Sequence, residues 1–155
     1  MALVEVLEWI PEGTEGRDKL VEILRSIVDV LPEYADPKTG MWYQVLDCPG
    51  KEGNYVEATC SAMFIYAMLK GSRMGLLDRK VEKYASSSYK KFLKTFVRTD
   101  EDGLLNIDSC CAVAGLGGKD NRSGDYNYYI HEKVISNDCK GVGPFIWASL
   151  EMERR

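Results

Sequence analysis

Residues 57–71 constrain the fold of this chain more than any other segment, because they predict a helix that is apolar on nearly every side. The stretch that begins at Ala58 reads ATCSAMFIYAML and leaves almost no polar stripe. A helix without a polar face has to be covered on all sides by other elements. The segment therefore predicts a central helix, with Asn54 and Glu57 as a candidate capping pair at its start.

Four further helices are predicted around this one. Along the chain, helices that are apolar on most sides alternate with amphipathic helices. Residues 17–34 and 79–97 are amphipathic, whereas residues 2–10 and 142–152 are apolar nearly all round, with Pro144 placed in a first turn. In the first amphipathic segment the expected apolar face consists of Leu20, Ile23, Leu24, Ile27, Val28 and Leu31. Helices apolar on every side, alternating with amphipathic ones, predict an all-α fold with an inner and an outer layer.

The connections between the predicted helices differ in length in a regular way. Segments 11–16 and 72–78 are short, whereas segments 35–56 and 98–141 are long. Because consecutive helices in two such layers run antiparallel, the long loops all fall at the N-terminal ends of the inner helices. Long loops on one face are where binding residues are usually found.

The two long loops begin alike, which indicates an internal repeat. Residues 36–48 read DPKTGMWYQVLDC, and residues 100–110 read DEDGLLNIDSC. Each loop turns at a glycine, passes through a strand-like piece and returns to an aspartate near a cysteine. Asp47 and Asp108 hold equivalent positions, which favours loop bracing over paired-carboxylate catalysis. A helical hairpin with a decorated loop, repeated along the chain, is typical of toroidal helical arrays.

Composition excludes several classes of partner. The net charge of −4 and the lack of a basic block argue against nucleic acid, and no apolar run is long enough to span a membrane. The N-terminus is acidic and lacks the basic region of a signal peptide, which favours a cytoplasmic location. Five cysteines without a C-x-x-C motif predict reduced structural thiols, and we expect neither a metal nor a cofactor. Residues 1–155 are expected to form a single domain.

The first group of candidate substrate-binding residues lies before and at the start of the central helix. Trp42, Tyr43 and Gln44 can form a sugar platform, in which rings pack on a pyranose and an amide fixes a hydroxyl. The alternative is a β-strand in which Trp42 serves packing. Asn54 and Glu57 can contact a ligand at the helix start, although a capping role explains both.

The second group lies in and after the longest loop. Tyr128 belongs to an aromatic cluster with Tyr126 and Tyr129, near His131, that can line a cleft. The alternation of residues there also fits a strand, with Tyr126 and Tyr128 on one side and Tyr129 on the other. His131 is the sole histidine, for which a structural hydrogen bond is the simpler role. Gly141 and Gly143 open the last helix, where free N–H groups can hold a uronate carboxylate, as at any exposed helix start.

Four separate segments together resemble one enzyme family. They are GMWYQVLD at 40–47, GNYVEATCSAMFIYAMLKG at 53–71, AVAGLGG at 112–118 and NDCKGVGPFIWA at 137–148. With them the chain is similar, from Met1 to Met152, to the unsaturated rhamnogalacturonyl hydrolases of glycoside hydrolase family 105 and to the related family 88. The resemblance implies the C-terminal half of an (α/α)6 barrel, a partial barrel of about five helices with a small β-hairpin element in its loops.

The resemblance also implies a reaction on pectin-derived oligosaccharides that carry a 4,5-unsaturated uronic acid at the non-reducing end. An aspartic acid protonates C4, water adds at C5, and the resulting hemiketal opens and releases the sugar. The catalytic aspartate of the family and its RGNGW-like motif do not occur in this sequence. No catalytic residue is therefore assigned, and the general acid is expected outside these residues.

Three hypotheses remain open at this point. The chain is part of such a hydrolase and needs the other half, or it is a non-catalytic remnant that acts as a weak carbohydrate-binding or oligomeric scaffold module. The third is an unrelated helical toroid that shares only the architecture. Because a half barrel leaves inner helices without neighbours, we expect a homo-oligomer or association with the missing N-terminal half.

Overall fold

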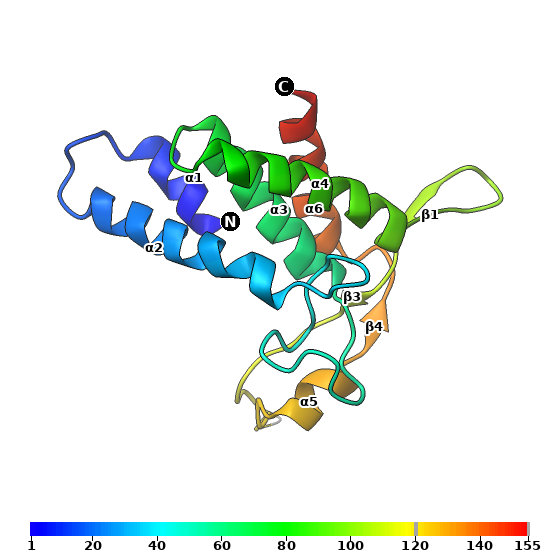
Figure 1. Ribbon diagram of the computed structural model, residues 1–155. Coiled ribbons are helices and arrows are strands. Elements are labelled where there is room, and N and C mark those ends of the chain that lie inside the picture. Colours follow the sequence, from blue (N-terminus) through cyan, green and yellow to red (C-terminus); the bar gives the residue numbers. More distant parts are fainter. Residues whose placement is uncertain (120, 155) are drawn as a thin grey trace.

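The computed structural model describes residues 1–119 and 121–154 and is mostly helical, as the sequence predicts (Figure 1). Its long helices are α1 (Ala2–Trp9), α2 (Arg17–Val30), α3 (Ala58–Arg73), α4 (Arg79–Phe96) and α6 (Cys139–Glu153). Two short helices complete the helical part, namely the 3-10 helix η1 (Leu31–Tyr34), which continues α2, and α5 (Tyr126–His131) in the last long loop.

Small antiparallel sheets occupy the loops, again as the sequence predicts. In the first sheet β1 (Val97–Thr99) pairs with β2 (Leu105–Ile107), and in the second β3 (Cys110–Cys111) pairs with β4 (Val134–Ile135). The β1–β2 hairpin projects away from the helices (Figure 1). The second sheet brings the start and the end of the segment between β3 and β4 together.

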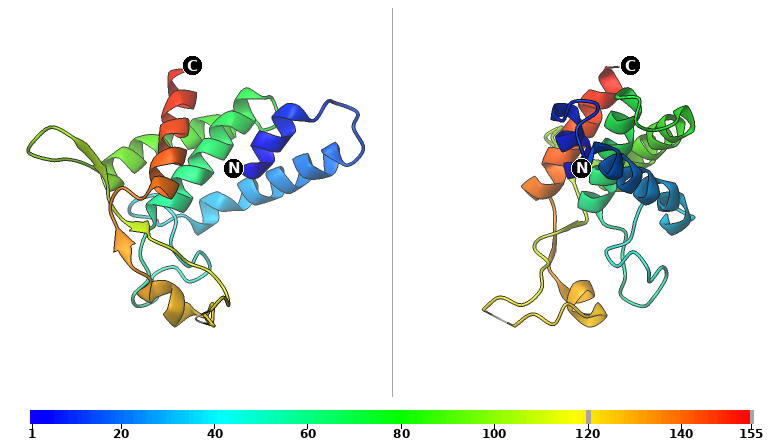
Figure 2. Two further views of the ribbon diagram at one scale, coloured as in Figure 1. Left: turned by 180° about the vertical axis from the view of Figure 1, so that it is seen from behind. Right: turned by 90° about the vertical axis from the view of Figure 1, so that its left-hand side faces the viewer.

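Helix α3 is the central element, as its all-round apolar sequence predicts. Ten of its 16 residues are buried. It packs against α6, α4 and α1, so neighbours cover it on several sides (Figures 1 and 2). The hydrophobic effect therefore makes α3 the element around which the others assemble.

The five long helices form two layers in an open array. In Figure 1 α2 and α4 lie in front, α3 lies behind α4, and α6 and α1 lie further back. The short connections α1–α2 and α3–α4 lie at one end of the helices, and the long loops extend from the other end (Figure 2). This agrees with the predicted face of long loops at the N-terminal ends of α3 and α6. No helix of the described residues is both long and apolar enough to cross a lipid bilayer.

The buried face of α2 differs from the predicted one. Val21, Leu24 and Val28 are buried, whereas Ile23 is 38% exposed and Ile27 is 42% exposed. The stripe that packs is narrower than the apolar stripe of the sequence, because only one side of α2 meets other described elements. The remaining apolar residues of α2 form an open surface.

The outermost inner-layer helices also differ from the prediction that they are buried on all sides. Trp9 of α1 is 82% exposed, and Ile146, Trp147 and Leu150 of α6 are between 43% and 49% exposed. Within the described residues no element covers these sides of α1 and α6. Both helices are thus edges of the array, whereas α3 is its interior.

A cluster of ion pairs joins the inner-layer helices at the end opposite the long loops. Lys70 is 4% exposed, and its Nζ lies 2.8 Å from Glu5 Oε1 and 2.8 Å from Glu8 Oε2. Arg73 Nε lies 2.6 Å from Oε2 of the buried Glu151. Burial alone would lower the pKa of Lys70, but its hydrogen bonds to the two glutamates outweigh burial and raise that pKa. This inner-helix ion cluster (Glu5, Glu8, Lys70, Arg73, Glu151) fixes α1, α3 and α6 relative to one another.

Candidate functional site

Trp42 is a core residue, and the prediction that it stacks on a sugar is corrected. Its relative exposure is 0%, and its indole Nε1 donates a hydrogen bond to the Leu31 carbonyl at 2.8 Å. The ring packs edge-on against Phe64 and Tyr84, with centroids 5.3 and 6.5 Å away. The bridge between Ala35 and Trp42 holds the backbone so that the ring lies in the core. The packing alternative therefore describes this residue.

The Tyr43 side chain stabilises the turn that follows η1. Its hydroxyl donates to Asp36 Oδ1 at 2.6 Å, while the amide and hydroxyl of Thr39 both donate to Oδ2 at 2.7 Å. Asp36 is 8% exposed. Burial would raise the pKa of Asp36, but the hydrogen bonds from Tyr43 and Thr39 outweigh burial and lower that pKa. Asp36 is thus an ionised centre around which residues 36–43 fold.

The internal repeat is visible in the hydrogen bonds of the second long loop. Asp100 Oδ1 accepts from the amides of Asp102 at 3.1 Å and Leu104 at 2.9 Å, as Asp36 accepts from Thr39. Asp108 accepts from Arg98 Nε at 3.0 Å and from Ser136 Oγ at 2.6 Å. The predicted bracing role of Asp108 is therefore confirmed.

Glu57 is the N-cap of α3 and also holds β3. Its Oε2 accepts from the Cys60 amide at 2.6 Å, and its Oε1 accepts from the Cys111 amide at 2.9 Å. Glu57 is 2% exposed, so the main-chain N–H groups replace water around this carboxylate. The predicted capping role of Glu57 is confirmed, and both carboxylate oxygens already have partners.

Asn54 does not cap α3, because the helix begins only at Ala58. Its Oδ1 accepts from the Val45 amide at 3.1 Å, and its Nδ2 donates to the carbonyls of Val45 at 2.9 Å and Cys48 at 2.7 Å. Asn54 therefore folds the loop between residues 44 and 55. The capping-box prediction is corrected to a single cap by Glu57.

A small pocket, here called the base pocket, lies at the N-terminal end of α3. Its volume is about 170 Å³, and it is lined by Gln44, Glu57, Thr59, Cys60, Met63, Cys111 and Ala114. Gln44 Nε2 donates to Cys111 Sγ at 3.3 Å. Burial raises the pKa values of Cys60 and Cys111, so both remain neutral thiols at physiological pH. The base pocket is mainly apolar, with the Gln44 amide at its edge.

A larger pocket, here called the tip pocket, lies between the tips of the two long loops. Its volume is about 560 Å³, and it is lined by Lys51, Glu52, Gly53, Asp125, Tyr126, Asn127, Ile130 and His131. His131 Nδ1 lies 2.7 Å from the Asn127 carbonyl, which confirms the predicted structural hydrogen bond. Since the carbonyl accepts, Nδ1 carries the proton, and Nε2 is left for another partner.

The tyrosine cluster forms a helix and not the strand that its alternation favours. Asp125 caps α5, because its Oδ1 accepts from the Tyr128 amide at 2.8 Å. The Tyr128 hydroxyl accepts from the Gly115 amide at 3.1 Å, and Tyr128 does not line the tip pocket. Of the predicted cluster, Tyr126 lines the tip pocket, together with the neighbouring His131. A role for Tyr128 in binding stays a prediction.

The start of α6 differs from the prediction at Gly141 and Gly143. The helix begins at Cys139, three residues earlier than predicted, so Pro144 lies inside it. Asp138 is the cap: its Oδ1 accepts from the Lys140 amide at 2.8 Å, and its carbonyl accepts from the Gly141 amide at 2.9 Å. These donors are already used, which removes the proposed uronate contact at Gly141. Gly143 stays untested as a binding residue.

Gly141 has a packing role instead. A Cβ at this position would lie 2.9 Å from Cys110 Sγ and 3.1 Å from Thr59 Oγ1. Only glycine lets α6 approach β3 and α3 this closely.

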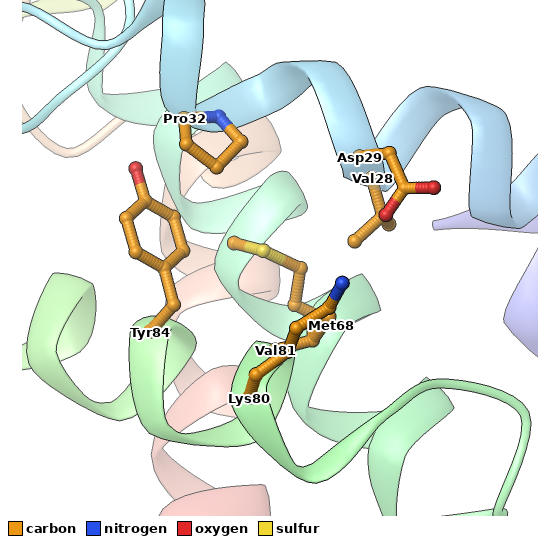
Figure 3. A pocket seen from close by; sticks show the side chains of 7 residues that line it. All are labelled: Val28, Asp29, Pro32, Met68, Lys80, Val81 and Tyr84. Atoms are coloured by element: carbon orange, nitrogen blue, oxygen red, sulfur yellow. The ribbon is translucent and has the colours of Figure 1, made fainter.

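A third pocket lies between α2, α3 and α4, away from the long loops (Figure 3). Its volume is about 270 Å³, and it is lined by Val28, Asp29, Pro32, Met68, Lys80, Val81 and Tyr84. Met68 lies between Tyr84 and Val28 at the centre of the view, and the lining is mainly apolar (Figure 3). None of the predicted site residues lines this pocket.

Of the predicted binding residues, Gln44 and Glu57 line the base pocket and His131 lines the tip pocket, whereas most of the other lining residues were not predicted. Cys60 could have been found, because it lies one helical turn after Glu57. Cys111 gave no local signal, since it meets Glu57 across 54 residues. Lys51 gave none either, because Tyr126, whose ring it covers, lies far along the chain.

Comparison with known proteins places the whole chain in one family. The model of Glycosyl Hydrolase Family 88 matches residues 1–155. The 24.9 kDa protein in the picA locus of Rhizobium radiobacter is 39% identical over 160 residues, covering 97% of this chain and 66% of that protein. The chain thus spans somewhat less than two thirds of this relative.

Solved structures agree with the family match. A Clostridium structure, the C. acetobutylicum ATCC 824 glycoside hydrolase from family 105, matches with a TM-score of 0.96 and 43% identity, covering 100% of this chain and 43% of that one. The glycosyl hydrolase family 88 protein from Bacteroides vulgatus has a TM-score of 0.71 at 20% identity, covering 99% of this chain and 40% of that one, and shows the fold alone. By sequence and by fold, the chain belongs to glycosyl hydrolase family 88.

Proposed function

We propose that this chain is the C-terminal half of a glycoside hydrolase of the unsaturated rhamnogalacturonyl type. The observation that carries the proposal is the match over the full chain to a family 105 glycoside hydrolase, at 43% identity and a TM-score of 0.96. The base and tip pockets support it, because both lie on the loops at the N-terminal ends of the inner-layer helices. Polar groups and aromatic rings gathered on such loops suit a sugar ligand.

The substrate is an oligosaccharide, derived from pectin, with a 4,5-unsaturated uronic acid at its non-reducing end. In the reaction a carboxylic acid donates a proton to C4 and water adds at C5. The hemiketal then opens and releases the remaining sugar. Glu57 does not serve as this acid, because it is buried and both of its oxygens accept main-chain hydrogen bonds. The acid comes from residues outside this chain.

The five long helices are one part of an (α/α)6 barrel, and the exposed sides of α1, α2 and α6 are where further helices complete it. Apolar residues on these sides support the proposal, since such residues are buried in a closed ring.

A chimera tests the proposal. The part of the Clostridium family 105 hydrolase that has no counterpart here is fused to this chain, and loss of double-bond absorbance is followed with an unsaturated rhamnogalacturonan disaccharide. We expect the chimera to consume the substrate and this chain alone to leave it unchanged. Turnover by this chain alone would show that it contains the acid, and a folded but inactive chimera would refute the substrate class.

The alternative is a non-catalytic remnant that acts as a weak carbohydrate-binding or oligomeric scaffold module. The exposed apolar side chains of α1, α2 and α6 favour the oligomeric scaffold, because they can be buried between copies of the chain. An inactive chimera together with direct sugar binding by this chain would support this alternative over the hydrolase.

A further inference from the structure

We propose that the tip pocket is a subsite for a neutral sugar residue of the substrate, separate from the position of the unsaturated uronic acid. The carbohydrate class of the ligand rests on the proposed function. The pocket itself, its construction and its charge rest on the described residues alone.

Both loops that form the tip pocket are closed at their bases by main-chain hydrogen bonds. The Gln44 amide donates to the Tyr55 carbonyl at 2.9 Å, and the Ala112 amide donates to the Lys133 carbonyl at 2.9 Å. The lining residues place the base pocket at these closed ends and the tip pocket between the tips of the same two loops. A chain of sugars that starts near the base can therefore continue along the loops to the tip.

The tip pocket is held in shape by contacts between segments far apart in the sequence. The Tyr126 hydroxyl donates to the Glu52 carbonyl at 2.9 Å across 74 residues, and Lys51 Nζ lies 3.8 Å from the centroid of the Tyr126 ring. Gly53 has a φ of +82°, and a Cβ there would lie 2.7 Å from Ile130 Cδ1. The close approach of Gly53 and Ile130 thus fixes one wall of the pocket.

The lining suits a sugar because donors, acceptors and apolar surface occur together. Lys51 and the Asn127 amide donate, whereas the carboxylates of Glu52 and Asp125 accept. Each hydroxyl of a sugar both donates and accepts, so it can use both kinds of group. Ile130 supplies apolar surface for the C–H face of a pyranose.

The charge of the lining favours a neutral sugar over a uronate. Among the acidic and basic side chains of the lining, one lysine, Lys51, faces two carboxylates, Glu52 and Asp125. The two carboxylates repel a third one, which would also lose hydration on entering the pocket. The uronic acid of the substrate therefore lies elsewhere on the loop face.

Direct binding to this chain tests the subsite. Methyl galactopyranoside and methyl rhamnopyranoside serve as neutral probes, and sodium glucuronate serves as the charged probe. We expect the neutral glycosides to shift NMR signals of Lys51, Tyr126 and His131 and to bind more tightly than glucuronate. Glucuronate binding more tightly than both glycosides, or neutral probes that leave these signals unchanged, would overturn the proposal.

A glycine pair supplies a matched test of the pocket wall. Gly53→Ala forces Ile130, which lines the pocket, to shift, and we expect the affinity for the bound glycoside to fall about tenfold or more. Gly50→Ala is the control, because Gly50 lies in the same loop with a φ of +70° and a Cβ there would meet no atom within 4 Å, so the backbone strain is similar without the clash. Equal loss of binding in both variants would contradict the subsite.

A second variant removes the dependence on glycine conformation. Lys51→Ala replaces an exposed side chain, so folding is preserved while a donor is lost, and we expect weaker glycoside binding. Unchanged binding in this variant would count against the subsite. In the active chimera a raised KM with Gly53→Ala, but not with Gly50→Ala, would support it. An inactive chimera whose tip pocket still binds glycosides would contradict the proposed function and would still support the sugar-binding pocket.

Discussion

Buried carboxylates determine how the loops of this chain fold. Asp36 accepts hydrogen bonds from the amide and hydroxyl of Thr39 and from the hydroxyl of Tyr43. Glu57 accepts hydrogen bonds from the amides of Cys60 and Cys111. A buried ionised group is stable only when hydrogen bonds replace its hydration, and here the donors come from the segments that it joins. These side chains are therefore structural, although their residue type also suits catalysis.

Asp36→Asn tests the turn that follows η1. We expect a loss of about 1–3 kcal/mol in the free energy of unfolding, because the amide presents N–H groups to donors that need an acceptor. The folded state lowers the pKa of Asp36, so its ionised form contributes stability that is fully present above the unfolded pKa of about 4. That contribution disappears as the pH falls through the folded pKa.

Urea unfolding of both proteins at a series of pH values measures this effect. The difference between wild type and Asp36→Asn should be constant near neutral pH and shrink below about pH 4. Asp102→Asn, an exposed aspartate in the equivalent turn of the second loop, is the control and should change stability little. A difference that persists undiminished in acid would show that ionisation of Asp36 is not its cause.

At the scale of elements, the sequence predicts well which helices exist, but it predicts less well which face of each helix is buried. All five long helices are where periodicity places them, since apolar spacing reflects burial directly. The start of α6 was missed because the Asp138 cap lies four residues before the apolar run at 142–152. The exposure of Ile23 and Ile27 was missed because periodicity shows which residues are apolar, whereas the neighbours decide which are covered.

The candidate site was predictable only in part, for a related reason. Gln44, Glu57 and His131 stand in loops or at a helix start, where local sequence signals exist. The short helix α5 escaped prediction because tertiary context and one cap outweigh the alternation of its tyrosines. Contacts such as Tyr126 with Glu52 join segments 74 residues apart and leave no local pattern.

Glu57→Ala tests the joint between α3 and β3. Two main-chain N–H groups lose a charged acceptor, and we expect the free energy of unfolding to fall by about 2–4 kcal/mol. Hydrogen exchange should accelerate at the amides of Cys60 and Cys111 in the variant. Glu12→Ala, at an exposed loop position, serves as the control. Unchanged protection of the Cys111 amide would show that Glu57 does not hold β3.

At the scale of the whole molecule, the array has an interior helix and open edges. The exposed apolar side chains of α1 and α6 lie on the inner layer, and those of α2 lie on the outer layer; they are Val6, Trp9, Ile23, Ile27, Val30, Ile146, Trp147 and Leu150. An apolar surface of this extent is favourable to cover, whether by further helices or by another copy of the chain.

We expect the isolated chain to self-associate through these edges. Ile146→Asp places a charge on the open side of α6 and should weaken association at micromolar concentration, because burial of the new carboxylate is unfavourable. Light scattering and sedimentation equilibrium measure the mass. Leu104→Asp is the control, since Leu104 is 64% exposed on the projecting β1–β2 hairpin. A monomeric wild-type chain at micromolar concentration would contradict the expectation.

The inner-helix ion cluster joins the C-terminal parts of α1, α3 and α6, whereas the long loops lead into the N-terminal ends of α3 and α6. The ion pairs of Lys70 and Arg73 therefore hold these helices together at a distance from the loops. On the proposed function, grafting the segments 45–54 and 113–132 from other family members should therefore exchange sugar preference, while the melting temperature of the helical scaffold is kept. The division between loops and helices would then let glycan selectivity be engineered in the loops alone.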